Sequence, residues 1–399
     1  MVSVITSYPA SLHLLLALLL TIVQGLSHDD EIPDYLAKYG IPTEQHWVTT
    51  SDGYILSMFR MRRPSAPVVM LQHGILSSAW CWLDNSPEIA PGFQLYYMGY
   101  DVWLTNNRGN MFSLNHTSLK PFLNKQFWNF SFTEMGHYDV PANIDYILGQ
   151  TGKETLAYVG HSEGTTQFFS AMTSIETKVF LEQKVSLFVC LSPVSYMSHQ
   201  STLLLRVVTD LRLGLLLESI FPFGFLTWSG LREAASTLCH LTEGIICQLG
   251  SGIVTGYSQE DDSEAIANVS AHFPAGTSVK AMEHYEQLIL SNRFQEYDYG
   301  AEGNLKSYGT REPPQFDFGQ AQVPTAFFIG TSDDLGDPVD EERAAAELPK
   351  STLVFKGSFP DYSHITWMAG TWSSFQAWFP RLQELLRKYH PLESPQLIV

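Results

Sequence analysis

The sequence is poor in positive charge and in cysteine. Its 399 residues contain 23 Lys and Arg against 41 Asp and Glu, a formal net charge of −18 at pH 7. Proteins bind nucleic acids mainly by placing positively charged side chains against the phosphates. The excess of negative charge therefore argues against a nucleic acid as the main partner. Four cysteines are too few for a disulfide scaffold. With 45% hydrophobic and 16% charged residues, the chain nevertheless has the composition of a folded protein.

The apolar run near the N-terminus is well short of the roughly 20 residues that a membrane-spanning helix needs. Residues 14–20 are all Leu or Ala, and a small residue, Gly25, precedes a polar stretch. This order is typical of a signal peptide at residues 1–25, although the run is preceded by no Lys or Arg, and an uncleaved anchor is the alternative. We therefore expect an extracellular or lysosomal protein without a transmembrane anchor.

Asn-x-Ser/Thr triplets begin at Asn115, Asn129 and Asn268. In a chain that enters the secretory pathway these are candidate sites of N-glycosylation. We therefore predict that all three side chains lie at the surface.

The strand pattern indicates an α/β sheet. An Asp-Gly pair at residues 52–53 joins two extended runs, 46–50 and 54–59, and predicts a hairpin. The later strand candidates are short and almost continuously apolar, as parallel strands are when both faces are covered. Helical stretches separate several of them, which predicts a mostly parallel central sheet with helices on both faces. These candidates are residues 68–71, 100–104, 156–159, 187–191 and 325–329.

The pattern breaks down between about residues 196 and 320, which indicates an insertion. We therefore divide the chain after the signal peptide into a first core part at 26–195, the insertion at 196–320 and a second core part at 321–399. The most apolar part of the insertion, residues 203–228, is interrupted by charged residues and so does not predict a membrane span. Two compatible interpretations remain, a packed pair of helices and a lining or lid for an acyl-chain pocket.

The strongest motif is Gly-His-Ser-Glu-Gly at residues 160–164. It follows the strand candidate 156–159 directly and precedes a helical run at 165–174. In that setting the motif predicts a nucleophile elbow, a sharp turn that holds the hydroxyl of Ser162 at the carboxyl edge of the sheet.

A serine hydroxyl needs a base, and the base needs a carboxylate that orients it. The carboxylate candidate is Asp333, the first acidic residue after the strand candidate 325–329. Asp334 and Asp337 are alternatives that would otherwise cap or solvate the next helix. The base candidate is His364, which follows an extended run at 353–355, whereas we expect His390 to be solvated.

The oxyanion formed during ester cleavage needs N–H donors that are already in place. The elbow supplies the backbone N–H of Glu163. The loop after the strand candidate 68–71 offers the N–H of Ile75, and we interpret His73 as a residue that shapes this loop.

No metal or nucleotide cofactor is implied. The acidic run after residue 332 is not an EF-hand loop, because Pro338 stands where that loop needs glycine. The glycines of residues 250–256 are spaced wrongly for a dinucleotide fingerprint, and no metal-ligand spacing of Cys or His occurs.

From about Ile41 to Trp367 the chain resembles the acid lipase family of gastric and lysosomal lipases. The resemblance implies an α/β-hydrolase fold with an inserted, mainly helical cap, and it places the nucleophile on Ser162, the acid on Asp333 and the base on His364. It places the oxyanion donors on Ile75 and Glu163. The matching blocks are residues 49–56, 71–74, 99–104, 108–110, 127–135, 138–139, 141–142 and 274–279.

The chain departs from the family at two places. The gastric and lysosomal lipases carry Gln after the nucleophile, where this chain has Glu163. An ionised carboxylate near an oxyanion is unfavourable, so we hypothesise that the site tolerates or prefers acidic pH. Of the cap disulfide that the resemblance implies, only Cys247 has a counterpart, and Cys239 with Cys247 is an alternative pair.

The resemblance implies a lipase that cleaves triacylglycerols or sterol esters at an emulsion or membrane interface. One alternative is an esterase for smaller, soluble esters. A second is a non-catalytic lipid carrier, whose usual signature, a missing triad residue, is not found here.

Overall fold

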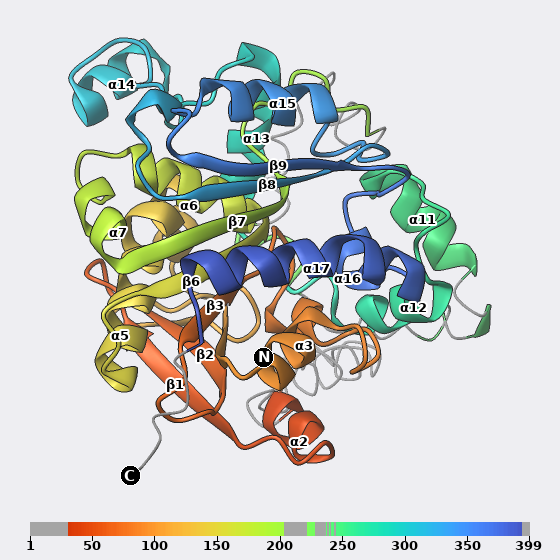
Figure 1. Ribbon diagram of the computed structural model, residues 1–399. Coiled ribbons are helices and arrows are strands. Elements are labelled where there is room, and N and C mark those ends of the chain that lie inside the picture. Colours follow the sequence, from red (N-terminus) through yellow and green to blue (C-terminus); the bar gives the residue numbers. More distant parts are fainter. Residues whose placement is uncertain are drawn as a thin grey trace, which may run out of the picture.

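The computed structural model describes residues 31–202, 222–227, 237, 239, 241–242 and 245–392 (Figure 1). The predicted signal peptide and most of the apolar stretch at 203–228 lie outside these residues. Within the described part, no helix is both long and apolar enough to cross a membrane.

The described strands form one nine-stranded sheet in the order β1-β2-β4-β3-β6-β7-β8-β9, with β5 paired to β2. The pairs β1–β2, β2–β4 and β2–β5 are antiparallel, and every other pair is parallel. The strands are β1 (Thr43–Thr49), β2 (Tyr54–Met61), β3 (Val68–Gln72), β4 (Asp101–Thr105), β5 (Asn115–His116), β6 (Leu156–Ser162), β7 (Val185–Pro193), β8 (Thr325–Gly330) and β9 (Leu353–Phe359).

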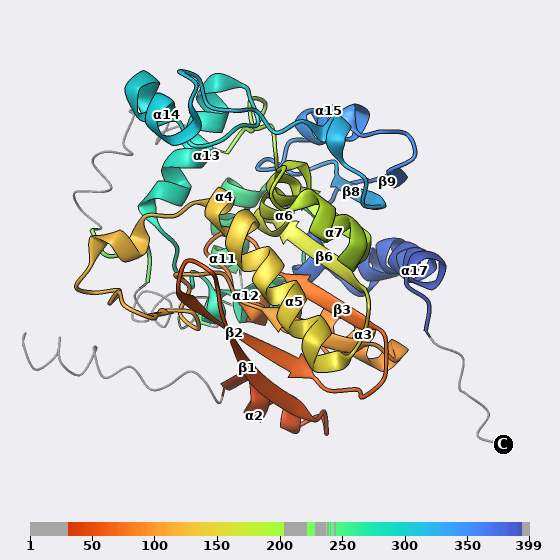
Figure 2. The same cartoon turned by 90° about the vertical axis from the view of Figure 1, so that its left-hand side faces the viewer.

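Helices cover both faces of this sheet (Figures 1 and 2). The longer ones are α2 (Glu31–Ala37), α3 (Pro91–Met98), α5 (Val140–Thr151), α6 (Glu163–Thr173), α7 (Lys178–Lys184), α11 (Ile245–Thr255), α12 (Ser263–His272), α13 (Val279–Ser291), α14 (Gly300–Tyr308), α15 (Pro338–Glu347) and α17 (Trp372–Tyr389). The short segments are η2 (Ala79–Trp82), η3 (Lys125–Trp128), α4 (Phe132–Glu134), η4 (Met135–Asp139), η5 (Phe318–Gln320) and α16 (Thr366–Ala369).

The strand sequences are apolar at nearly every position because successive side chains point to opposite faces of the sheet and pack in two different cores. In β3, Val69 and Leu71 join a core that contains residues of α3 and α17. Val68 and Met70 point the other way, into a core that contains residues of α5, α6 and α15. A strand buried on both faces therefore has no polar side to alternate with.

The predicted α/β-hydrolase sheet is confirmed. The five continuous apolar runs correspond to β3, β4, β6, β7 and β8, and the hairpin corresponds to β1 and β2. The short strand β5 was not predicted, because its two residues carry too little pattern. Strands β7 and β8 are neighbours although residues 194–324 separate them, and the elements described between them are helices and isolated bridges.

Candidate active site

Ser162 lies at the junction of β6 and α6, as the elbow motif predicts. Its backbone has φ 54° and ψ −124°, a strained conformation for a residue with a side chain. The turn reverses the chain abruptly, so the hydroxyl is presented at the carboxyl end of β6 while the helix packs back on the sheet.

Two glycines allow this turn to sit close to its neighbours. A Cβ atom on Gly164 would lie 2.4 Å from the carbonyl oxygen of Gln72 in β3. A Cβ atom on Gly74 would lie 2.8 Å from the Cβ of Ser162. The loop after β3 therefore passes directly beside the nucleophile.

His364 and Asp333 form a buried hydrogen-bonded pair. The Nδ1–H of His364 donates to both carboxylate oxygens of Asp333, at 3.0 and 2.8 Å. The backbone N–H groups of Leu335 and Gly336 also donate to Asp333 Oδ1, at 3.0 and 2.7 Å. These bonds fix the carboxylate and place the proton on Nδ1, which leaves Nε2 free to accept another.

The two alternative acids have other partners. Asp337 caps α15 by accepting the backbone N–H of Val339, at 2.8 Å. Asp334 accepts the hydroxyl of Ser201. Of the three acidic residues, the geometry therefore brings Asp333 against the imidazole.

The imidazole of His364 lies beside the elbow. Its ring centroid is 4.9 Å from that of His161, the residue before Ser162, and His161 Nε2–H donates to the His364 carbonyl oxygen at 2.8 Å. Within the described residues, Nε2 of His364 is buried and forms no hydrogen bond, including none with Ser162 Oγ. The structure thus brings base and nucleophile to the same place with the acceptor nitrogen unoccupied.

The predicted oxyanion donors belong to two segments that meet at Ser162, the start of α6 and the loop after β3. Glu163 is the first residue of α6, where a backbone N–H has no partner within the helix. Ile75 follows Gly74 in the loop after β3. His73 holds this loop: its Nδ1–H donates to the Gly74 carbonyl at 2.7 Å, and its Nε2 accepts the Asn107 N–H at 3.1 Å. Burial lowers the pKa of His73 to about 4, so its ring is neutral and suited to this exchange.

The carboxyl group of Glu163 is buried, with 1% of the residue exposed. Asn107 Nδ2 donates to its Oε2 at 3.3 Å, and no hydrogen bond to its Oε1 is found within the described residues. Burial raises the pKa of Glu163 to about 8, against smaller lowering contributions from the nearby Tyr285 hydroxyl and from Asn107. The side chain is therefore a neutral carboxylic acid at neutral and acidic pH.

Two further buried carboxyl groups lie near the triad and were not predicted. Asp261 contacts the residues around His364. Glu341 of α15 lies near Asp333, and burial, followed by the charge of Asp333, raises its pKa well above the ordinary value. Glu341 belongs to the acidic run Asp340-Glu341-Glu342, which has the composition of a solvated helix face. No local pattern in the sequence marks its burial.

His390 is a correction. We expected a solvated side chain after a charged helix, but the residue is buried, and its Nδ1 lies 2.9 Å from Ser186 Oγ. The helix α17 ends against the sheet, so its last turn brings His390 inward beside Tyr100. Burial lowers the pKa of His390 to about 4.

The remaining candidate sites are a cysteine pair and three Asn-x-Ser/Thr triplets. Cys239 and Cys247 are joined by a disulfide. Asn115 and Asn129 are exposed, and Asn268 is half-buried on α12. Among the described residues, no group of three or more His, Cys, Asp or Glu is arranged to hold a metal ion.

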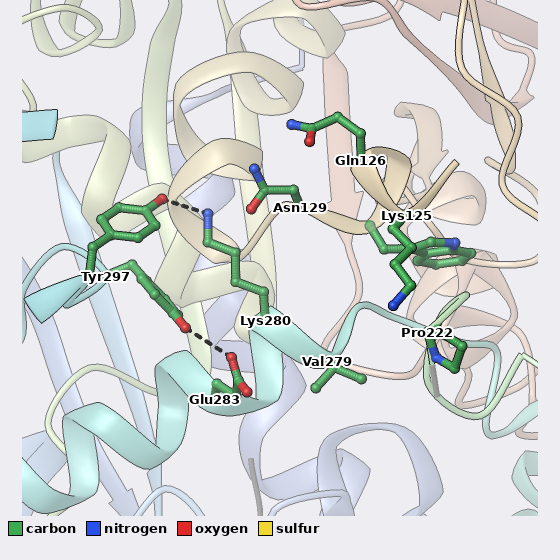
Figure 3. A pocket seen from close by; sticks show the side chains of 10 residues that line it. Lys125, Gln126, Asn129, Pro222, Val279, Lys280, Glu283 and Tyr297 are labelled. Carbon is green, nitrogen blue, oxygen red and sulfur yellow. Dashed lines mark hydrogen bonds between the residues drawn. The ribbon is translucent and has the colours of Figure 1, made fainter. Parts of the chain in front are cut away.

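A cavity of about 300 Å³ lies between η3 and α13 (Figure 3). Lys280 and Asn129 are among its lining residues, and Lys280 Nζ donates to the hydroxyl of Tyr299 at 2.8 Å. Because none of the triad residues lines it, this cavity is not the place where an ester carbonyl could meet Ser162.

The fold and the elbow define the class. A family model described as "alpha/beta hydrolase fold" matches residues 67–370, and one described as "partial alpha/beta-hydrolase lipase region" matches residues 32–86. The chain is similar in fold to a soluble variant of monoglyceride lipase from Saccharomyces cerevisiae, with a TM-score of 0.54 and 16% identity over 88% of this chain and 96% of that one. It is an α/β hydrolase.

Sequence relatives define the family more narrowly. Gastric triacylglycerol lipase from Bos taurus is 34% identical over 84% of this chain and 85% of its own length. Lysosomal acid lipase/cholesteryl ester hydrolase from Homo sapiens is 32% identical over 90% of this chain and 91% of its own length. The chain belongs to the family of the gastric and lysosomal acid lipases.

Proposed function

We propose that this protein is a lipase that hydrolyses carboxylic esters of neutral lipids, triacylglycerols or sterol esters, through Ser162, His364 and Asp333. The observation that carries the proposal is the buried His364–Asp333 pair, whose unoccupied Nε2 lies beside the elbow that presents Ser162. The relatives, which are named for triacylglycerol and cholesteryl ester hydrolysis, support this substrate class.

In the proposed reaction, Ser162 Oγ attacks the acyl carbon as Nε2 of His364 takes its proton. The oxyanion is held by the N–H groups of Ile75 and Glu163. Nε2–H then gives the proton to the alcohol oxygen as the ester C–O bond breaks, leaving an acyl-enzyme. Water attacks this ester by the same route and releases the fatty acid. The Ser162–His364 hydrogen bond needs to form only in the substrate complex, where catalytic contacts commonly tighten.

The segment at residues 196–320 is proposed as the cap that receives the lipid. Its helix α11 contains no charged residue and exposes Ile246, Leu249 and Ile253 by 45%, 60% and 55%. The carbonyl oxygen of Thr255, at the end of this helix, accepts the N–H of His364 at 2.9 Å. This exposed apolar face is hydrogen-bonded to the backbone of the catalytic base. It therefore supports a substrate at a lipid surface rather than a soluble ester.

A substrate comparison tests this function. We expect the wild-type protein to hydrolyse a long-chain triacylglycerol emulsion, and Ser162→Ala to hydrolyse neither the emulsion nor a soluble short-chain ester. Leu249→Ser with Ile253→Ser should lower emulsion hydrolysis about tenfold or more and leave the soluble ester unaffected. The matched control is Ile175→Ser, which changes an equally apolar exposed residue far from α11 in sequence.

The outcomes separate the two alternatives. Hydrolysis of soluble esters alone would indicate the esterase. Failure of wild-type Ser162 to react with an organophosphonate that targets active serines would indicate a non-catalytic lipid carrier.

We also propose that the protein travels the secretory pathway to the cell exterior or the lysosome. The apolar run at residues 14–20, the exposed triplets at Asn115 and Asn129, and relatives named as gastric and lysosomal enzymes support this destination.

A further inference from the structure

Asp261 lies between α11 and α12, about a hundred residues before the catalytic base, yet its carboxylate is buried against the loop that carries that base. The hydroxyl of Ser363 donates to Asp261 Oδ2 at 2.8 Å. The hydroxyl of Thr366 donates to Asp261 Oδ1 at 2.5 Å. These two hydroxyls belong to residues on either side of His364 in the sequence. One carboxylate therefore binds the chain both before and after the catalytic base.

The same hydroxyl oxygens accept backbone N–H groups next to His364. The N–H of Ser363 donates to Thr366 Oγ1 at 2.9 Å, and the N–H of Ile365 donates to Ser363 Oγ at 3.3 Å. Each hydroxyl therefore accepts a hydrogen bond from a backbone N–H beside His364 and donates one to Asp261. Because a carboxylate only accepts, its presence fixes the direction of both chains of hydrogen bonds.

The backbone around Asp261 braces the loop a second time. His364 N–H donates to the Thr255 carbonyl at 2.9 Å, and Asp262 N–H donates to the Ala369 carbonyl at 2.8 Å. Asp261 itself forms an isolated bridge with Gly370. The helix α12 that follows packs on α16, and α11 and α12 are seen next to each other in Figure 1. The segment at 255–262 thus serves as a support for the loop at 361–371.

Among the described residues, the charged groups that act on the Asp261 carboxylate are Glu260 and Asp361, both acidic. Glu260 precedes it on its own segment, and Asp361 faces it from the loop after β9. His364 lies in sequence between its two hydroxyl partners. Burial raises the pKa of Asp261 to about 6, the hydroxyls of Thr366 and Ser363 lower it, and the charges of Asp361 and Glu260 raise it further. Within the described part of the chain no cation pairs with this buried carboxylate, and hydroxyl hydrogen bonds stabilise it instead.

We propose that Asp261 is a positioning residue for the ester hydrolysis: by holding the hydroxyls of Ser363 and Thr366 it fixes the orientation of His364, and it connects the inserted segment to the catalytic base. This inference rests on the proposed function, because it assigns Asp261 no contact with substrate. When Asp261 is protonated, its O–H becomes a donor, and one of the two hydroxyls must turn away.

The variant Asp261→Asn tests the proposal with almost no change in shape. Its amide nitrogen cannot accept, so one hydroxyl bond is lost. We expect kcat for a soluble ester to fall by about tenfold to a hundredfold, with KM within about twofold, because the base is misplaced while the substrate site is intact. The pH profile should change as well, since the ionisation near pH 6 disappears.

Glu260→Gln is the matched control. Glu260 also accepts two hydroxyls, those of Thr371 and Ser373 at 3.0 and 2.9 Å, but these residues do not flank His364. If Asp261 only stabilises the loop, the two substitutions should have similar effects on kcat. If Asp261 positions His364, only Asp261→Asn should lower kcat. Thr366→Val, which removes one hydroxyl at constant shape, should reproduce the loss and should add little to Asp261→Asn.

The rate of labelling by an organophosphonate distinguishes the failure of this proposal from failure of the proposed function. If the wild-type protein is not labelled at Ser162, the proposed function is wrong. If it is labelled, and Asp261→Asn and Thr366→Val are labelled at the wild-type rate with an unchanged pH profile, Asp261 does not position the base. If Asp261→Asn does not fold, Thr366→Val alone decides the question.

Discussion

Replacing Glu163 by glutamine removes an ionisable group from the residue whose N–H is the proposed oxyanion donor. Burial raises the pKa of this carboxyl group from an ordinary 4.5 to about 8, so the native side chain is uncharged at acidic and neutral pH and becomes charged only in alkaline solution. Glutamine has nearly the same shape and can still accept the hydrogen bond from Asn107 Nδ2. The substitution therefore tests the charge and little else.

The expected effect on the rate follows from Coulomb's law. We take the separation between the Glu163 carboxylate and an oxyanion held by its own N–H as about one side-chain length, on the order of 5 Å, for use in Coulomb's law. With an effective dielectric constant of about 20, two negative charges at this distance repel by about 3 kcal/mol, or about a hundredfold in rate. The wild-type kcat for a soluble ester should thus fall above pH 8, relative to Glu163→Gln, by up to this factor. Below about pH 6 the two proteins should be equally active.

The same ionisation affects stability. Between pH 4.5 and about 8 the folded protein keeps a proton that the unfolded chain releases, so the native state loses stability as the pH rises through this window. At about 1.4 kcal/mol per pH unit the loss is at most about 5 kcal/mol. Glutamine does not titrate. The free energy of unfolding of Glu163→Gln, measured relative to that of the wild type, should therefore increase as the pH rises from 5 to 8.

The assay combines a pH–rate profile on a soluble ester with denaturant unfolding at pH 5 and pH 8. Glu182→Gln, which removes an exposed carboxyl on α7, is the control and should match the wild type in both measurements. Superimposable wild-type and Glu163→Gln pH–rate profiles would refute the reasoning about the oxyanion. An equal difference in stability at the two pH values would refute the burial argument.

Two other predictions concern the triad and the destination. Asp333→Asn should lower kcat for a soluble ester by about 10³–10⁴-fold with little change in KM, because it removes the charge that holds His364 Nδ1–H; steady-state kinetics check this, and a loss under tenfold would contradict it. Protein recovered from the medium or lysosomes of expressing cells should lose mass on deglycosylation with a peptide N-glycosidase, and Asn115→Gln with Asn129→Gln should reduce that loss; unglycosylated protein confined to the cytosol would contradict the proposed route.

The sequence predicts those features whose signal is local. Continuous apolar runs predict strands buried on both faces, and the elbow motif places Ser162 because the motif, its strand and its helix are contiguous. Asp333 and His364 could be predicted as well, since each follows a strand end and the carboxyl ends of parallel strands share one edge of the sheet. The resemblance to acid lipases points to the same three residues, so it agrees with the assignment made from the motif and the strand ends.

The features that escape prediction are those decided by burial between distant segments. Asp261 stands in the polar run Gln259-Glu260-Asp261-Asp262, which has the composition of a solvated turn, yet the return of this segment to His364 buries it. The prediction for His390 is wrong for the same reason, since only the packing of α17 on the sheet determines which way the residue after this helix faces. A pattern of residue types cannot distinguish these positions from exposed ones.

Glu163 and Asp261, two of the buried carboxyl groups with raised pKa values, constrain the chemistry differently. Glu163, on the nucleophile side, ionises near pH 8, and its charge would oppose the oxyanion, so it sets an alkaline limit. Asp261, on the base side, ionises near pH 6, and its charge holds the hydroxyls around His364, so protonation loosens the base on the acidic side. Between these two values Glu163 is neutral while Asp261 is charged, the combination that favours both oxyanion and base. The double variant Glu163→Gln, Asp261→Asn should therefore lose both of these limits on the pH–rate profile.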